Sequence, residues 1–433
     1  MDRTLATRYA ESVRQLERAE AVIPRGSQTF SKSRTQYPVG AAPLFVERSE
    51  GCHTWDVDGN EYIDLVSSLG AVIFGYCDPE IDEAVMRQMR NGMTLSLSHP
   101  LEERVAAGLV DLIPCAEKVR FAKNGTDATS AAVRLARAAT GRDHVIACGY
   151  HGWQDWFIGS TTRNLGVPEA VQSLTHAVPY GDLAAIEKEI AAHRNEIAAL
   201  IMEPMTSTFP EPGFLEAVRK VTEEQGIVLV FDEMLTGFRF APGGAQEYFG
   251  VTPDLAAFGK GLANGMPLSA VMGRAELMDF MENVFFSGTY GGETLSLAAA
   301  EVVVNRVSSG EPTDRLAKIG GQLVDAIEAR RPARSREFLS FSGHDSWVFL
   351  RWHVNEPDRL NLVKTLFLQE MLRRGVLVLG THDVTIAFSQ EDIDRVADAY
   401  GETLEILVEG LDAEDLHVRL SCEPLVPLFT LRQ

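Results

Sequence analysis

The sequence lacks several features that would assign it to particular classes of protein. Its five cysteines include no CxxC pair and its ten histidines show no HxxxH spacing, so we expect neither a disulfide framework nor a metal site. Its apolar stretches, such as Ile227–Phe231, are too short to span a bilayer. Basic residues are also scarce: 40 Lys and Arg against 61 Asp and Glu give a net charge of −21. That charge disfavours a nucleic-acid partner, and an acid-containing N-terminus without an apolar leader favours a cytoplasmic location.

What the sequence does contain is a regular alternation of helical and strand patterns from about residue 100. Hydrophobic residues make up 45% of the 433 residues, enough for a large core. Several expected strands are continuous apolar runs, which is typical of strands covered by helices on both faces. The alternation therefore predicts an α/β fold with a mostly parallel, doubly wound sheet. The expected strands are Lys118–Ala122, His144–Cys148, Ala198–Met202, Ile227–Phe231, Leu255–Phe258 and Leu268–Met272.

The flanking regions predict two further segments. The sequence predicts an amphipathic helix within residues 1–65, followed by two short strands around Phe45 and Tyr62. We expect the turn pair Asp58-Gly59 to join these two strands. Residues 66–308 form the large α/β domain. Residues 309–433 read as a smaller α+β domain.

The residues that follow the strands are of interest because ligands of open α/β sheets bind at the carboxyl ends of the strands. Gly125 and Thr126 open a helix, where free N–H groups suit a phosphate, although an ordinary capped helix start is the alternative. Tyr150 begins a ring-rich loop that suits either a planar ligand or loop packing. Asp232 ends a buried apolar strand and needs a cation. Lys260, between two glycines, is placed to form a Schiff base.

Together these four features specify one cofactor. Pyridoxal 5′-phosphate needs a lysine, a carboxylate for its ring nitrogen, a ring to stack on it and a helix N-terminus for its phosphate. The rival dinucleotide motif fails, because Asn264 stands where GxGxxG requires glycine. The sequence therefore predicts a pyridoxal-phosphate enzyme.

The chain resembles the class-III aminotransferases of fold type I, and most closely their glutamate-1-semialdehyde 2,1-aminomutase branch. The segments that carry this resemblance are "FAKNGTDATSAAVRLARAATGRD", "YHGW", "IMEPM", "VFDEMLTGFR", "FGKGLANGMPLSAVMG" and "GTYGGETLSLAAA". The resemblance implies a homodimer with shared active sites. It also implies roles for individual residues: Lys260 as the Schiff-base lysine, Asp232 as partner of the pyridine nitrogen, Gly125 and Thr126 at the phosphate, Tyr150 and Met234 on the two ring faces, Thr289 at the partner subunit's phosphate, and Glu203 and Ser68 near the substrate.

The departures from the aminomutase pattern concern the substrate. Lys32 stands where the aminomutase has an arginine for the substrate carboxylate, and Leu69 stands where it has a tryptophan. Glu293-Thr294 replaces the usual Asn-Pro, and 375–390 holds no arginine to pair with Glu203. These changes favour an aminotransferase with two separate substrates over an intramolecular aminomutase. A catalytically silent homologue is a third, remote reading, since every cofactor position is filled.

We expect the acceptor to be a polar carbonyl compound such as a sugar or cyclitol, and the donor to be an amino acid such as glutamate. Trp153 and Trp156 would offer faces for ring C–H groups, unless the loop's own packing buries both. Glu293 and His382-Asp383 would add polar groups to the pocket.

Overall fold

The computed structural model describes residues 5–426, which fall into two compact units. Of the described residues, unit 1 combines 5–78 with 315–426, and unit 2 is Pro79–Asp314. The expected N-terminal and C-terminal segments thus share one unit. One physical reason is that β13 (Val376–Leu377) pairs in parallel with β3 (Glu61–Asp64).

Unit 2 is built on a seven-stranded sheet of order β4-β10-β9-β8-β7-β5-β6. The strands are β4 (Lys118–Ala122), β5 (His144–Cys148), β6 (Thr175–Ala177), β7 (Ile197–Met202), β8 (Val228–Asp232), β9 (Leu255–Phe258) and β10 (Ser269–Gly273). Neighbours from β9 to β6 are parallel, whereas β10 is antiparallel to both β4 and β9. The predicted α/β class with a mostly parallel sheet is confirmed, while the edge strand β6 was not predicted.

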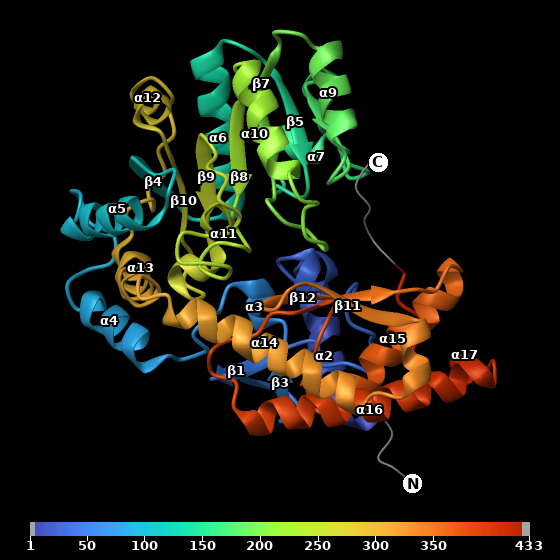
Figure 1. The fold of residues 1–433 in the computed structure, drawn as a ribbon. Helices are drawn as coiled ribbons and strands as arrows, with labels where there is room; N and C mark the ends of the chain where they lie inside the picture. Colours follow the sequence, from blue (N-terminus) through green and yellow to red (C-terminus); the bar gives the residue numbers. More distant parts are fainter. Residues whose placement is uncertain (1–4, 427–433) are drawn as a thin grey trace. The chain divides into compact units, whose positions relative to one another are not determined.

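Helices cover both faces of this sheet (Figure 1). Helix α6 (Gly125–Thr140) packs on Val145 and Ala199, while α9 (Leu183–Ala192) and α10 (Phe214–Glu224) pack on the opposite face. Because neighbouring strand residues point to opposite faces, both faces must be apolar, which explains the uninterrupted apolar runs. Each fully buried aliphatic side chain contributes about 1.5–3 kcal/mol.

The remaining helices of unit 2 lie around the sheet. Helices α4 (Pro79–Met89), α5 (Pro100–Leu112) and α13 (Thr294–Val307) pack together, and the short helices are α7 (Asp155–Ile158), α8 (Glu169–Gln172), α11 (Ala245–Phe249) and α12 (Ala275–Met278). Pro100 at the first position of α5, preceded by the capping residue His99, sets where that helix begins.

Unit 1 holds two small sheets and long covering helices. One sheet has the order β1-β2-β3-β13 and the other β11-β12-β14. Their further strands are β1 (Val46–Glu50), β2 (His53–Asp56), β11 (Leu339–His344), β12 (Trp347–Trp352) and β14 (Thr381–His382). The helices are α1 (Leu5–Arg8), α2 (Ala10–Glu20), α3 (Ser67–Gly70), α14 (Glu311–Arg330, which begins in unit 2), α15 (Pro357–Arg373), α16 (Gln390–Asp412) and α17 (Leu416–Arg419).

One prediction for this unit was wrong. The turn at Asp58-Gly59 joins β2 to β3, and Phe45 precedes a separate strand, β1. Strand β1 could not be predicted from the sequence, because its side chains are mostly exposed and the strand therefore lacks an apolar pattern. Within residues 5–426, none of the helices has the length and apolar character that a membrane crossing requires.

Candidate active site

Asp232 and His151 form a buried pair at the carboxyl edge of the unit 2 sheet. Asp232 is the last residue of β8, and its Oδ2 lies 2.8 Å from Nδ1 of His151. Its Oδ1 accepts a hydrogen bond from the backbone N–H of Met234 at 3.1 Å. The other ring nitrogen of His151, Nε2, is buried without a hydrogen-bond partner among the described residues. A buried carboxylate backed by an imidazole is suited to hold a protonated ring nitrogen of a ligand.

Lys260 follows β9 and begins the short 3₁₀ helix η3 (Lys260–Ala263). Its φ of 46° lies in the left-handed region, which is rare for a residue other than glycine and costs about 1–3 kcal/mol. Its positive charge acts on Glu203, as does the negative charge of Asp232. The fold therefore brings an amine and two carboxylates to one edge of the sheet.

Glycines let the backbone close around the start of α6. A Cβ on Gly152 would lie 2.3 Å from Oγ1 of Thr126, and a Cβ on Gly125 would lie 2.9 Å from Sδ of Met234. The Thr126 hydroxyl accepts a hydrogen bond from the N–H of Trp153 at 3.3 Å. This cradle puts the N-terminal end of a 16-residue helix, with its positive dipole, next to the loop after β5.

Glu203 and Tyr150 complete this edge. Oε2 of Glu203 accepts a hydrogen bond from the Tyr150 N–H at 3.2 Å. Burial, together with the nearby charge of Asp232, raises the pKa of Glu203 to about 7. The Tyr150 ring is 52% exposed and is held edge-on by Phe157, with ring centroids 5.6 Å apart. One face of a fixed aromatic ring is thus open to a planar ligand.

The two tryptophans of the following loop differ. Trp153 is 65% exposed, whereas Trp156 is buried, and its indole N–H donates to the Ser130 hydroxyl at 2.8 Å. The expectation of an open Trp156 face is therefore wrong, because that ring joins the core beneath α6. Trp153 remains available to a ligand.

In unit 1, the predicted substrate residues Lys32 and Ser68 lie together. Nζ of Lys32 is 3.4 Å from Oγ of Ser68, and both line a cavity of about 380 Å³. Ser68 belongs to α3, in which residues 67–70 all have positive φ. The buried Asp64 holds this strained turn by accepting hydrogen bonds from the N–H groups of Val66 and Ser67. No sequence pattern predicts this left-handed turn.

The other predicted polar residues have structural partners. Glu293 caps α13 by accepting from the Leu295 and Ser296 N–H groups, and its ion pair with Lys123, at 3.0 Å, links it to the loop before α6. Thr289 is exposed and lines a cavity of about 540 Å³. The expectation that His382 lines the pocket is wrong: it is fully buried in unit 1, with Nε2 2.6 Å from the Tyr400 hydroxyl, and burial lowers its pKa to about 3.

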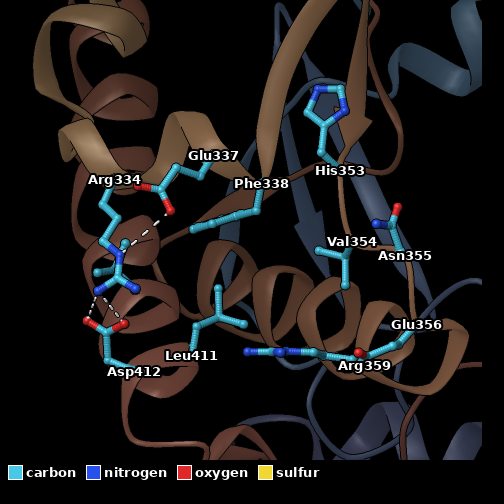
Figure 2. Close-up of a pocket in the computed structure, with 11 residues that line it drawn as sticks. Arg334, Glu337, Phe338, His353, Val354, Asn355, Glu356, Arg359, Leu411 and Asp412 are labelled. Atoms are coloured by element: carbon cyan, nitrogen blue, oxygen red, sulfur yellow. Dashed lines mark hydrogen bonds and ion pairs between the residues drawn. The ribbon is translucent and has the colours of Figure 1, made fainter.

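Figure 2 shows a separate cavity of about 320 Å³ in unit 1. Arg334, at its edge, pairs with Asp412 at 2.5 Å and with Glu337 at 3.8 Å, so these three charged groups already pair with one another. None of the predicted site residues lines it.

The fold and the arrangement around Asp232, Lys260 and the start of α6 define a pyridoxal-phosphate-dependent enzyme of fold type I. A family model described as aminotransferase class-III matches residues 36–399, and the chain belongs to this family. The predicted family and cofactor, pyridoxal 5′-phosphate, are thereby confirmed.

Relatives with different activities resemble the chain. Glutamate-1-semialdehyde 2,1-aminomutase of Rhodopirellula baltica is 38% identical over 336 residues, 73% of this chain and 76% of that enzyme. 3-Aminobutyryl-CoA aminotransferase of Cloacimonas acidaminovorans is 31% identical over 411 residues, 92% and 97% of the two chains. Among solved structures, the PLP internal aldimine form of the FumI protein of Sphingopyxis sp. MTA144 has a TM-score of 0.86 at 27% identity, covering 96% of this chain and 99% of that one.

His151 is a candidate site residue that was not predicted from the sequence. The ring-rich loop after β5 predicts a stacking surface at Tyr150, whereas the structure shows that the next side chain, His151, contacts Asp232 directly. A histidine next to the stacking tyrosine was the available signal, but its partner is 81 residues away.

Proposed function

We propose that the chain is an aminotransferase that takes an amino group from an amino-acid donor and passes it to a separate carbonyl acceptor. The observation that carries this proposal is the meeting of Lys260, Asp232 and the start of α6 at one edge of the sheet. When bound, pyridoxal phosphate supplies an electron sink for the carbanion that forms when the substrate carbon loses its proton.

The residues of this chain would divide the work as follows. Asp232 would hold the proton of the cofactor's ring nitrogen, and His151 would fix the orientation of that carboxylate. The N–H groups of Gly125 and Thr126 would bind the phosphate. Tyr150 would stack on one ring face and Met234 would pack on the other. The Lys260 amine would act as general base and acid at the substrate carbon.

The acceptor in this proposal is a polar, hydroxyl-bearing carbonyl compound of the sugar or cyclitol kind. Its support is Lys32, whose ammonium cannot form the bidentate fork of an arginine, the neighbouring Ser68 hydroxyl and the exposed face of Trp153. Trp156 and His382 do not support this acceptor class, because both side chains are buried.

Half-reaction screening tests this proposal. The holoenzyme would be mixed with a panel of amino acids, amino sugars and aminocyclitols, and the loss of cofactor absorbance near its long-wavelength band would be followed. Rapid bleaching by an amino acid and by at least one amino sugar or aminocyclitol supports the proposal. Bleaching by amino acids alone contradicts the acceptor class, and bleaching by no amine contradicts the transaminase.

The aminomutase is a second candidate function, because a relative with that name is 40% identical to this chain over 331 residues. It shares the cofactor residues, so only turnover separates the two. Efficient conversion of glutamate 1-semialdehyde to 5-aminolevulinate without a second substrate would establish the aminomutase instead.

A homodimer with shared active sites is part of the proposal. The loop that carries Thr289 is flanked by the exposed Phe285 and Tyr290, and the cavity at Thr289 is also lined by Leu95 and Leu97, exposed by 44% and 85%. Apolar side chains gathered in this way mark an interaction surface.

A further inference from the structure

Three histidines that are far apart in the sequence meet in unit 2. His144 is the first residue of β5, His176 is the middle residue of β6, and His193 caps the C-terminal end of α9. One ring nitrogen of each lies within 4.8 Å of the others. The ring centroids are 4.2 to 5.1 Å apart. Figure 1 shows α9 beside β5, where this cluster lies.

Two carboxylates face the cluster. Oε2 of Glu189 lies 3.5 Å from Nδ1 of His176 and 4.0 Å from Nε2 of His193. Oε2 of Glu196 lies 3.5 Å from the other ring nitrogen of His193. Neutral imidazoles are frequent metal ligands, and two carboxylates around three of them leave a local charge that a divalent cation would balance.

We propose that His144, His176, His193 and Glu189 bind a zinc ion. In a tetrahedral zinc site with bonds of 2.0–2.2 Å, the donor atoms are about 3.4 Å apart. The three histidine donors already lie within 4.8 Å of one another and reach that spacing when each moves by about 1 Å, which a rotation of the imidazoles about Cβ–Cγ provides. Glu189, whose Oε2 lies 3.5 Å from Nδ1 of His176 and 4.0 Å from Nε2 of His193, would turn toward the ion as the fourth ligand. Glu196 would then hold the free ring nitrogen of His193, the usual arrangement behind a metal-bound histidine.

The site is separate from the catalytic residues. His144 stands at the opposite end of β5 from Cys148, which precedes the Tyr150 loop, and this strand of five residues is about 13 Å long. A four-ligand site is of the closed, structural kind. The ion would tie the three-residue edge strand β6 to β5 and to the end of α9. The side chains of His176 and His193 are 17% and 27% exposed, so the ion can load from solvent.

The alternative without a metal ion is a stack of imidazoles held by the hydrogen bond between Nδ1 of His144 and Nε2 of His176, at 2.8 Å. A rival metal cluster is Cys52, His53 and Asp392 in unit 1. There His53 already lies between the carboxylates of Glu61 and Asp392, and burial raises the pKa of the Cys52 thiol, which opposes the thiolate that a metal requires. We therefore favour the three-histidine cluster.

The test is calorimetric titration of the chelator-treated holoenzyme with ZnCl₂, with metal content measured after dialysis. The wild type is expected to bind one equivalent per chain at this cluster and to unfold at a higher temperature with zinc. His193→Gln and Glu189→Gln should each weaken that binding by about tenfold or more. His53→Gln is the matched control and should keep it. Unchanged cofactor absorbance and circular dichroism would show that each variant is folded.

Three results would overturn the proposal. They are no stoichiometric zinc binding by the wild type, binding by His193→Gln and Glu189→Gln as tight as in the wild type, or loss of the equivalent in His53→Gln. Cobalt(II) provides an independent check, because it gives intense visible bands only in a tetrahedral site. Those bands should appear in the wild type and be absent from His193→Gln.

Discussion

At the scale of the residue, Asp232 and its neighbour Glu233 differ in the partners of their buried carboxylates, because only Asp232 pairs with His151. The next residue, Glu233, is also a buried carboxylate, but it accepts hydrogen bonds from the N–H groups of Ala245 and Gln246 and from the Thr236 hydroxyl. Glu233 is therefore fully used by the fold. Asp232 instead has an imidazole behind it, and that imidazole keeps an unpartnered buried nitrogen.

This contrast provides a matched pair of variants. Asp232→Asn keeps the shape of the side chain but removes the charge that a protonated ring nitrogen needs, so we expect kcat/KM to fall on the order of a hundredfold or more. The cofactor absorbance should shift as well. Glu233→Gln should lower the thermal stability but leave the cofactor spectrum unchanged. A spectrum shifted by Glu233→Gln and unaltered by Asp232→Asn would contradict the assignment.

Glu203 predicts a pH dependence of stability. Its pKa is raised from 4.5 to about 7, so the folded state favours the protonated form. The associated stability is present below pH 4.5 and is lost as the pH rises through 7, a change of roughly 3 kcal/mol at most. Glu203→Gln does not titrate, so its stability relative to the wild type should increase between pH 4.5 and 7.

The comparison is best made by thermal unfolding of the cofactor-free protein at several pH values. Glu187→Gln, on the exposed side of α9, is the control and should follow the wild type throughout. If the difference between Glu203→Gln and the wild type stays constant with pH, the raised pKa of Glu203 is wrong.

At the scale of the element, the start of α6 depends on glycines that permit close approach. Gly152 has a φ of 109°, and a Cβ there would collide with Thr126. Gly166 has a similar φ of 90°, but a Cβ there would meet nothing within 4 Å. The two positions thus share the backbone strain and differ only in the collision.

Gly152→Ala should therefore displace the turn that we propose binds the phosphate and weaken pyridoxal-phosphate affinity by about tenfold or more, the equivalent of 1.4 kcal/mol. Gly166→Ala should retain the wild-type affinity. Equilibrium dialysis against the cofactor measures both, and equal affinities in the two variants would remove Gly152 from the site.

The elements differ in how well the sequence predicted them. Strands β5 and β9 have the expected bounds, because helices bury both of their faces and leave nearly unbroken apolar runs. The edge strand β4 also has the expected bounds, although its charged and apolar side chains alternate. The strands β6 and β1 were not predicted, since one has three residues and the other is mostly exposed. The left-handed turn at 67–70 contains three residues that ordinarily avoid positive φ, so only the tertiary hydrogen bonds of Asp64 explain it.

Among the candidate site residues too, those with a local sequence pattern could be predicted and those set by tertiary contacts could not. Asp232 and Lys260 could be found from the sequence because each breaks an apolar strand pattern with a charged group. The surroundings of Trp156 and His382 depend on packing against residues far along the chain, such as Ser130 and Tyr400, and were predicted wrongly for that reason.

At the scale of the whole molecule, we predict that assembly and cofactor binding are linked. Leu97, which lines the cavity at Thr289, is 85% exposed, whereas Leu165 lies in another loop and is fully exposed. If the surface around Leu97 and Thr289 joins two chains in a dimer, Leu97→Asp should give a monomer with weakened cofactor affinity. Leu165→Asp should remain a dimer. A monomeric wild type that is fully active at the same concentration, measured by light scattering, would refute the shared site.

The most direct test of the central claim is a single-turnover measurement with Lys260→Ala. The wild-type holoenzyme, mixed with an amino-acid donor found by the half-reaction screen, should lose its cofactor absorbance and release one oxo acid per chain. Lys260→Ala should stay folded and bind pyridoxal phosphate, but release the oxo acid roughly 10³-fold more slowly, because no amine moves the proton at the substrate carbon. Oxo-acid release by Lys260→Ala at the wild-type rate would contradict the account.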